Sequence, residues 1–305
     1  MKVAYSLPSS VLANDELAVL YPEWTADKIL AKTGIASRHV AGDGETALDL
    51  AESAAKKFFA EYAIDRGAVD HLILCTQSPE YSLPSTACLL HERLGLRKEA
   101  GALAFDHGCS GFIYGLSLAK GLIAGGMAKN VLLVTTETYT KYIASEDKST
   151  RTIFGDGAAA VLIDEEAAGK IGAFSFGTDG SGAEKLIVRD GRLFMDGPEI
   201  FNFTLEVVPK TMEDVLAKNG MTKDGIDLYV FHQANKFMLE TIRKVNGLPR
   251  DKFYVNIETT GNTVSSTIPI ALKQLEESGR LQSGMKVMLM GFGVGLSWGA
   301  TVITI

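Results

Sequence analysis

The sequence predicts an α/β fold of stacked layers that is built from two similar halves. Three observations indicate this fold. Apolar strands alternate with helical stretches, the strand pattern returns about 157 residues later, and each half closes with a glycine turn and an apolar strand. The chain has 305 residues, of which 46% are hydrophobic, so it can bury a sizeable core.

The internal repeat is clearest in two pairs of apolar strands. AVDHLILCTQS (68–78) matches GIDLYVFHQAN (225–235), with Asp70 and Asp227 in register at an offset of 157. KNVLLVTTE (129–137) matches MKVMLMGFG (285–293) at nearly the same offset. Each of these segments is typical of a buried strand.

The helices and the closing strands repeat in the same order. Residues 110–126 and 265–279 both carry apolar residues at helical spacing. FGDGAAAVLI (154–163) closes the first half, and GFGVGLSWGATVITI (291–305) closes the second. The acidic, alanine-rich DEEAAGK lies between them and is the natural joint, so we expect halves at 1–168 and 169–305.

Composition and charge exclude several classes of function. The net charge of −7 argues against a general nucleic-acid binder, which needs a basic surface. The chain has no signal-peptide pattern at its start and no apolar run of about 20 residues, so we expect a cytoplasmic protein without membrane insertion. Its three cysteines form no CxxC pair, which fits neither a disulfide framework nor a zinc site.

The repeat gives a reason for three distant polar residues to meet. Cys109 comes directly before one of the repeated helices, and Asn262, in TGNTVSS, comes just before the other. His232 ends a strand of the second half, where sheet proteins commonly carry functional groups. If a pseudo-twofold axis relates the halves, the starts of the two helices face each other near the centre. We therefore predict one site made by these three residues.

Cys109 is the candidate nucleophile. The unpaired N–H groups at a helix start favour thiolate over thiol, and the small neighbours Gly108 and Ser110 leave room for a substrate. Cys75 and Cys88 lie at no glycine-bounded helix start, so we expect both to be core packing residues. We expect His107 to lie inside the strand before the nucleophile, in a structural or supporting role.

His232 and Asn262 could each have a structural role in place of a catalytic one. A histidine at the end of an apolar strand can be a satisfied core residue, and an asparagine in TTGNT can be a turn or cap residue. Beside a thiol, however, a neutral imidazole and an amide can stabilise a developing enolate oxygen without a metal.

Motifs spread over nearly the whole chain resemble those of one family. They include TGI with Arg38, LPSTAC (83–88), GCSGF, FGDGAAA, GTDGSGA, HQAN (232–235), GNT (261–263) and GFGVGLSWGA. Together and in this order they resemble the thiolase-fold condensing enzymes, and within them the β-ketoacyl-acyl-carrier-protein synthase III group. The resemblance implies a five-layered αβαβα fold and a cytoplasmic, usually homodimeric acyltransferase. We expect the segment 102–107 to be where two sheets join across the twofold.

The resemblance also implies roles for the site residues. Cys109 would take an acyl group from a thioester, and the backbone N–H groups of Cys109 and Val294 would form the oxyanion hole. His232, through Nε2–H, and the Asn262 amide would stabilise the enolate formed when a malonyl-type thioester loses carbon dioxide. The resemblance implies no metal and no cofactor, because coenzyme A or acyl-carrier phosphopantetheine thioesters are the substrates.

Substrate-binding positions follow from the same resemblance, and several depart from the family pattern. Leu83 stands where phenylalanine is common at the acyl pocket, and Lys148 stands where an adenine-stacking arginine is common. Phe237 replaces an arginine used in docking an acyl carrier, although basic residues follow it. These departures suggest a specialised member that acts on a longer or unusual acyl group, in fatty acid or in polyketide or secondary-metabolite biosynthesis. The expected substrate-binding residues are Leu83, Lys148, Arg151, Asn235 and Phe237.

Four other interpretations remain to be weighed. A papain-like hydrolase also has Cys, His and Asn in this order, but GCSGF does not match its signature. GFGVG is followed by a strand-like segment, which does not fit a dinucleotide-binding turn. A non-catalytic subunit of a heteromeric synthase would not need Cys109, His232 and Asn262. Non-decarboxylating acyl transfer to a small hydroxyl or amine acceptor uses the same cysteine chemistry and remains open.

Overall fold

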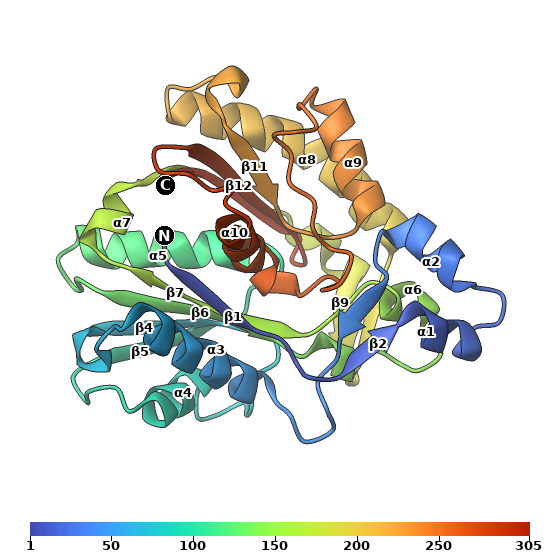
Figure 1. Ribbon diagram of the computed structural model, residues 1–305, viewed down its shortest axis with the longest axis horizontal. Helices are drawn as coiled ribbons and strands as arrows, with labels where there is room; N and C mark the ends of the chain where they lie inside the picture. Colours follow the sequence, from blue (N-terminus) through green and yellow to red (C-terminus); the bar gives the residue numbers. More distant parts are fainter.

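Two β-sheets with helices between and outside them form the protein (Figure 1). A computed structural model describes residues 1–305. The first sheet has the order β1-β7-β6-β4-β5, made of β1 (Val3–Ser6), β7 (Gly157–Ile163), β6 (Val131–Glu137), β4 (His71–Cys75) and β5 (Gly101–Phe105). The second has the order β8-β13-β12-β11, made of β8 (Ile171–Thr178), β13 (Ser297–Thr304), β12 (Lys286–Gly293) and β11 (Leu228–Phe231).

The two sheets repeat one topology. In each, the two central strands are antiparallel, and one of them has a parallel partner on its other side: β4 beside β6, and β11 beside β12. The matched aspartates make equivalent hydrogen bonds. Asp70 accepts the backbone N–H of Asn130 just before β6, and Asp227 accepts the backbone N–H of Lys286 at the start of β12. A parallel bridge between Tyr229 and Phe253 occupies the position that β5 holds in the first sheet.

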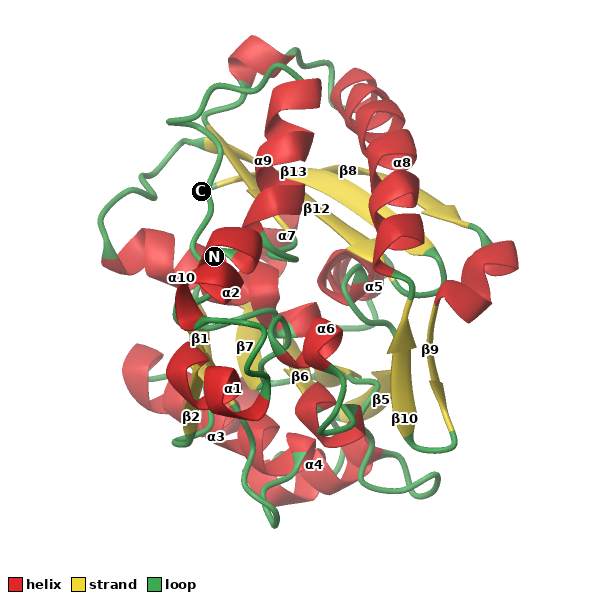
Figure 2. Cartoon of the chain, turned by 90° about the vertical axis from the view of Figure 1, so that its right-hand side faces the viewer, coloured by secondary structure: helices red, strands yellow, loops and turns green.

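Six helices complete the layers, and Figure 2 shows α8 and α9 outside the second sheet. Between the two sheets lie α5 (Gly111–Ala124) and α10 (Thr267–Glu277), whose apolar faces share one core with both sheets. Outside the first sheet lie α3 (Ala47–Tyr62) and α4 (Thr86–Leu94), and outside the second lie α8 (Gly197–Lys218) and α9 (Lys236–Val245). This is the expected five-layered αβαβα arrangement.

Shorter elements lie around these layers. They are β2 (Val11–Ala13), α1 (Asn14–Leu20), α2 (Ala26–Thr33), β3 (Ser37–His39), α6 (Lys148–Arg151), α7 (Glu165–Gly169), β9 (Leu186–Arg189) and β10 (Arg192–Met195). None of the helices is both long and apolar enough to cross a membrane.

Two expectations about single residues are wrong. The strand before the nucleophile, β5, ends at Phe105, so His107 lies in the following loop, where its ring centroid is 4.4 Å from that of Tyr114. Cys75 is buried, but Cys88 is exposed on α4, because it lies on the side of that helix away from the first sheet.

Candidate active site

Cys109 lies in the loop between β5 and α5, directly before the N-cap residue Ser110. Its side chain is 6% exposed, and the strand β12 passes close beside it. A Cβ atom added at Gly293 would lie 2.9 Å from Sγ of Cys109, so only glycine allows this approach. The Oγ atoms of Ser110 and Ser297 are 2.7 Å apart, which ties the turn after β12 to the start of α5.

The thiol is less acidic than the sequence suggests. Burial and the nearby carboxyl of Glu137 raise the pKa of Cys109 to about 12. The backbone N–H groups of Cys109 and Val294 act in the opposite direction, which is the effect expected of donors that face the sulfur. The N–H groups favour thiolate, as expected, but desolvation outweighs them, so the thiol form is the stable one.

His232 and Asn262 are brought to the same place by separate backbone contacts. The N–H of His232 donates to the carbonyl oxygen of Met290 on β12, which holds the end of β11. Asn262 forms a parallel bridge with Phe154, just before β7 of the first half. Nε2 of His232 and Nδ2 of Asn262 are 3.5 Å apart.

Hydrogen bonds on the side away from the cavity fix the orientation of the Asn262 and His232 side chains. Oδ1 of Asn262 accepts the backbone N–H of Val264 at 2.9 Å, so Nδ2 is the atom left for a ligand. Nδ1 of His232 lies 2.7 Å from Oγ1 of Thr267. Burial lowers the pKa of His232 to about 3, so its imidazole is neutral at physiological pH.

One cavity of about 100 Å³ is lined by Cys109, His232 and Asn262 together. The structure therefore brings together three residues from the two halves, as the repeat predicts. The chain holds no group of three His, Cys, Asp or Glu side chains that could bind a metal ion.

A wider cavity of about 970 Å³ adjoins this site and shares Asn235 and Met238 with it. Asn235 and Phe237 both line this outer cavity, and Phe237 stacks on Phe201 with ring centroids 5.4 Å apart. Trp24 lines the same cavity.

Three of the expected substrate-binding residues do not line the cavities beside Cys109. Lys148 forms an ion pair with Glu23, and its Nζ lies over the Trp24 ring, 6.0 Å from the ring centroid. Arg151 lines a separate cavity of about 430 Å³, which shares Phe154 with the cavity at Cys109. Leu83 is 83% exposed in the loop before α4.

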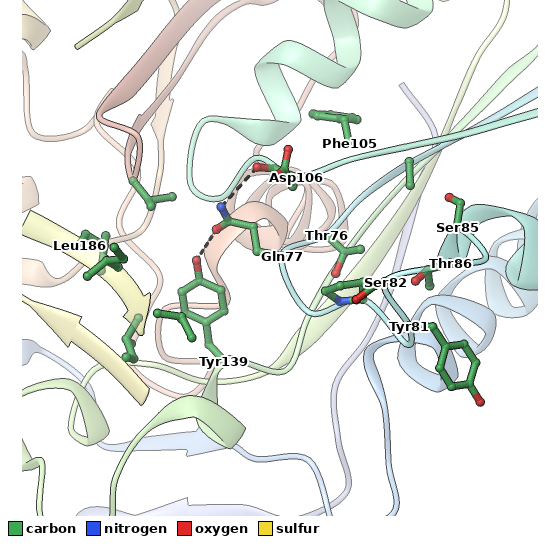
Figure 3. Close-up of a pocket in the computed structure, with 16 residues that line it drawn as sticks. Thr76, Gln77, Tyr81, Ser82, Ser85, Thr86, Phe105, Asp106, Tyr139 and Leu186 are labelled. Atoms are coloured by element: carbon green, nitrogen blue, oxygen red, sulfur yellow. Dashed lines mark hydrogen bonds between the residues drawn. The ribbon is translucent and has the colours of Figure 1, made fainter. Parts of the chain in front are cut away.

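A third cavity, of about 480 Å³, is lined by residues that follow β4 and β5 and by residues of β9 (Figure 3). Val294 and Gln77 line it, and a Cβ atom added at Gly108 would lie within 2.6 Å of both side chains. Gln77 accepts a hydrogen bond from the hydroxyl of Tyr139 and donates one to the carbonyl oxygen of Asp106, as Figure 3 shows. This third cavity thus has a polar wall close to Gly108, the residue before Cys109.

Several residues near the site were missed by the sequence reasoning. Glu137 is fully buried at the end of β6, and burial raises its pKa to about 8, while the backbone N–H of Gln77 and the hydroxyl of Ser78 donate to its carboxyl. A glutamate that ends a continuous apolar strand is an unusual residue, and this signal could have marked Glu137. Gln77 follows the end of β4, a position that also favours a functional group.

Comparisons with known proteins identify the family. Residues 105–180 match the family described as 3-oxoacyl-(acyl-carrier-protein) synthase III, and residues 216–305 match its C-terminal part. A β-ketoacyl-(acyl-carrier-protein) synthase III of Bacillus cereus is 36% identical over 97% of this chain and 95% of its own length.

Solved structures match the fold over its whole length. A crystal structure of a 3-oxoacyl-(acyl-carrier-protein) synthase III is 48% identical, with a TM-score of 0.97 over 99% of this chain and 98% of that one. The priming β-ketosynthase of a polyketide biosynthetic pathway is 28% identical, with a TM-score of 0.92 over 100% of this chain and 95% of that one. The chain therefore belongs to the β-ketoacyl-acyl-carrier-protein synthase III family of thiolase-fold enzymes.

Proposed function

We propose that the protein condenses an acyl thioester with a malonyl-type thioester through an acyl group held on Cys109. The observation that carries this proposal is the cavity that a thiol, a neutral imidazole and a carboxamide line together. The family membership supports the same reaction. We propose that this reaction belongs to fatty acid biosynthesis.

In the first half-reaction Cys109 is the nucleophile. Its sulfur attacks the thioester carbonyl, and the backbone N–H groups of Cys109 and Val294 stabilise the oxyanion. The bond from the carbonyl carbon to the donor sulfur then breaks. Because the pKa of Cys109 is about 12, its thiol proton has to be released in this step, and the leaving thiolate takes up a proton.

In the second half-reaction His232 and Asn262 act on the extender. Nε2–H of His232 and the Nδ2 amide of Asn262 donate to the thioester oxygen of the malonyl group, which becomes an enolate oxygen as carbon dioxide leaves. The enolate carbon attacks the acyl carbon on Cys109, and the C–S bond to the enzyme breaks. The thiolate of Cys109 is then protonated, and the free enzyme is restored.

The thioester arm enters through the outer cavity in this proposal. Coenzyme A or the phosphopantetheine of an acyl carrier would lie along Trp24, Asn235 and Phe237. Lys236, Lys244 and Arg250 have no ion pair or side-chain hydrogen bond within the chain, so their charges are free to attract an acidic carrier. The ion pair of Lys148 with Glu23 makes it a weaker partner for an adenine ring.

The third cavity supports the proposal of a specialised acyl substrate. Its volume is about 480 Å³, and its wall includes Val294, whose N–H is assigned to the oxyanion hole. The amide of Gln77 and the hydroxyl of Tyr139 add hydrogen-bonding groups to its wall. We propose that the acyl group is longer than acetyl or carries an oxygen substituent, and a polyketide pathway is the alternative setting.

We further propose a cytoplasmic homodimer. The edge strand β5 has no partner on one side, and Leu103 on this strand is 43% exposed. Leu83, in the loop that precedes α4, adds a second exposed apolar side chain near that edge. Pairing of two β5 edges would cover this surface.

The test uses the purified protein with acyl thioesters of increasing length, followed by a malonyl thioester. We expect intact-mass spectrometry to detect an acyl adduct that maps to Cys109 and is absent in Cys109→Ala. Carbon dioxide and a β-ketoacyl product should follow. An adduct without carbon dioxide release, whose acyl group passes to a hydroxyl or amine, would support non-decarboxylating transfer instead. A strict preference for acetyl would contradict the specialised substrate.

A further inference from the structure

The hydroxyl of Thr267 contacts Nδ1 of His232, the ring nitrogen away from the cavity, and the backbone of Val264 is also within hydrogen-bonding reach of the imidazole. Thr267 is 3% exposed in the first turn of α10, and its Oγ1 lies 2.7 Å from Nδ1. The same oxygen is also placed to donate to the carbonyl oxygen of Val264 at 3.0 Å, and that carbonyl accepts the backbone N–H of Thr267 as well. A hydroxyl has one proton, so it can donate to Nδ1 or to this carbonyl oxygen, but not fully to both.

The direction of this hydrogen bond decides which ring nitrogen carries the proton. The imidazole is neutral, so it has one N–H and one acceptor nitrogen. If Thr267 donates to Nδ1, the proton is on Nε2, and His232 is a donor toward the cavity. If Thr267 donates to Val264, Nδ1 carries the proton, and His232 presents a lone pair to the cavity.

The spacing on the cavity side favours the first arrangement. Oδ1 of Asn262 already accepts the N–H of Val264, so only the donor atom Nδ2 faces His232. Nδ2 and Nε2 are 3.5 Å apart, which is longer than the 2.7–3.2 Å of an ordinary N–H hydrogen bond. With the proton on Nε2, the two N–H groups do not satisfy each other and are free to converge on one substrate oxygen.

The local backbone is built around the same contacts. Val264 has φ of +54°, a left-handed conformation that is rare for a β-branched residue. This turn directs its N–H to Asn262, while its carbonyl oxygen lies close to Thr267. The O–H to Nδ1 contact is the shorter of the two that Thr267 makes.

We propose that Thr267 is a positioning residue that holds His232 as the Nε2–H tautomer and thereby makes it a donor in decarboxylation. This inference rests on the proposed function for its role in catalysis, but the tautomer itself does not depend on it. Without the hydroxyl, Nδ1–H can turn to the Val264 carbonyl, and the proton is then on the wrong nitrogen.

The test compares Thr267→Val, which keeps the shape and removes the hydroxyl, with Thr267→Ser, which keeps the hydroxyl. For Thr267→Val we expect carbon dioxide release from a malonyl thioester to fall about 100-fold, the loss typical of one oxyanion donor. Acyl-adduct formation on Cys109 should change by less than about threefold in both variants, since it does not use this donor. Thr267→Ser should retain most of the decarboxylation rate.

A matched control separates this effect from the loss of any buried hydroxyl. Thr211→Val removes a hydroxyl that is also buried in a helix, where it donates to the Val207 carbonyl at 2.7 Å far from the cavity. We expect this variant to keep both half-reactions. Nitrogen-15 NMR of histidine-labelled protein, with the signal assigned by His232→Ala, should show Nε2–H in the wild type and in Thr267→Ser, and Nδ1–H in Thr267→Val.

The outcomes also distinguish the inference from the proposed function. A wild-type protein in the Nδ1–H tautomer, or Thr267→Val that keeps Nε2–H and the wild-type decarboxylation rate, would overturn the inference. A tautomer that changes in Thr267→Val, in a wild-type protein that never releases carbon dioxide from malonyl thioesters, would support the positioning role and overturn the proposed function.

Discussion

Cys109 shows what a single residue's sequence position can and cannot predict. GCSGF correctly places a thiol before the helix α5, and the turn GFGVG approaches it. The protonation state depends on burial and on Glu137, which lies 28 positions further along the chain. Sequence spacing carries no information on desolvation, so the direction of the pKa shift could only come from the structure.

The first prediction concerns the pH dependence of this thiol. A raised pKa keeps Cys109 protonated, so its thiolate fraction should rise about tenfold per pH unit from pH 7 to pH 10 without a plateau. Iodoacetamide labelling, followed by mass spectrometry in a Cys75→Ser and Cys88→Ser background, measures this rate. Free cysteine is the control and levels off above its pKa of about 8.5.

A different pH profile of Cys109 labelling would contradict this prediction. A labelling rate that reaches its plateau near pH 7 would mean that the N–H groups of Cys109 and Val294 outweigh burial. The site would then hold a thiolate before any substrate binds, as the sequence alone suggests.

At the scale of elements, the repeated strands and helices were predictable because their apolar periodicity is strong. Residues 110–126 and 265–279 contain α5 and α10, and the apolar segments contain β4, β6, β11 and β12. The loops were harder to predict. The directions of Arg151 and Leu83 depend on packing around Phe154 and on an exposed turn, which no local pattern encodes.

The turn between β12 and β13 gives a second prediction. Gly293→Ala adds a Cβ atom 2.9 Å from the sulfur of Cys109, so we expect a loss of about 1–3 kcal/mol of unfolding free energy and at least tenfold slower acylation. Denaturant unfolding and the rate of adduct formation measure these effects.

Gly121→Ala is the matched control for this change. Gly121 lies within α5, and an added Cβ atom there meets nothing within 4 Å. This variant should acylate normally and gain about 0.5–1 kcal/mol, because alanine is a better helix former than glycine. If Gly293→Ala behaved like Gly121→Ala, β12 would not constrain the nucleophile.

At the scale of the whole molecule, the duplication was the strongest signal in the sequence. Asp70 and Asp227 mark it, and each ties the start of a neighbouring strand in its own sheet. We propose that the halves divide at 168/169 and depend on each other. Lys273 of α10 supports this, because it is paired with Glu61 of α3 across the two halves. The site itself needs both halves, since each supplies part of it.

A third prediction concerns assembly. Leu103→Lys places a charge on the open edge of β5, so the proposed dimer should dissociate at micromolar concentration. Light scattering after size-exclusion chromatography gives the mass. Val19→Lys, at a position that is 80% exposed on α1, should leave the mass unchanged. A wild-type monomer, or a dimer that persists in Leu103→Lys, would contradict pairing along β5.

The account depends most on the separate roles of Cys109 and His232 within one cavity. The direct test measures both half-reactions in His232→Ala: the yield of acyl adduct on Cys109, and the rate of carbon dioxide release from a malonyl thioester. We expect the adduct to form at nearly the wild-type rate and carbon dioxide release to fall at least 100-fold, because only the second step uses the imidazole as a donor. Equal loss of both half-reactions, or unchanged carbon dioxide release, would contradict this division of roles.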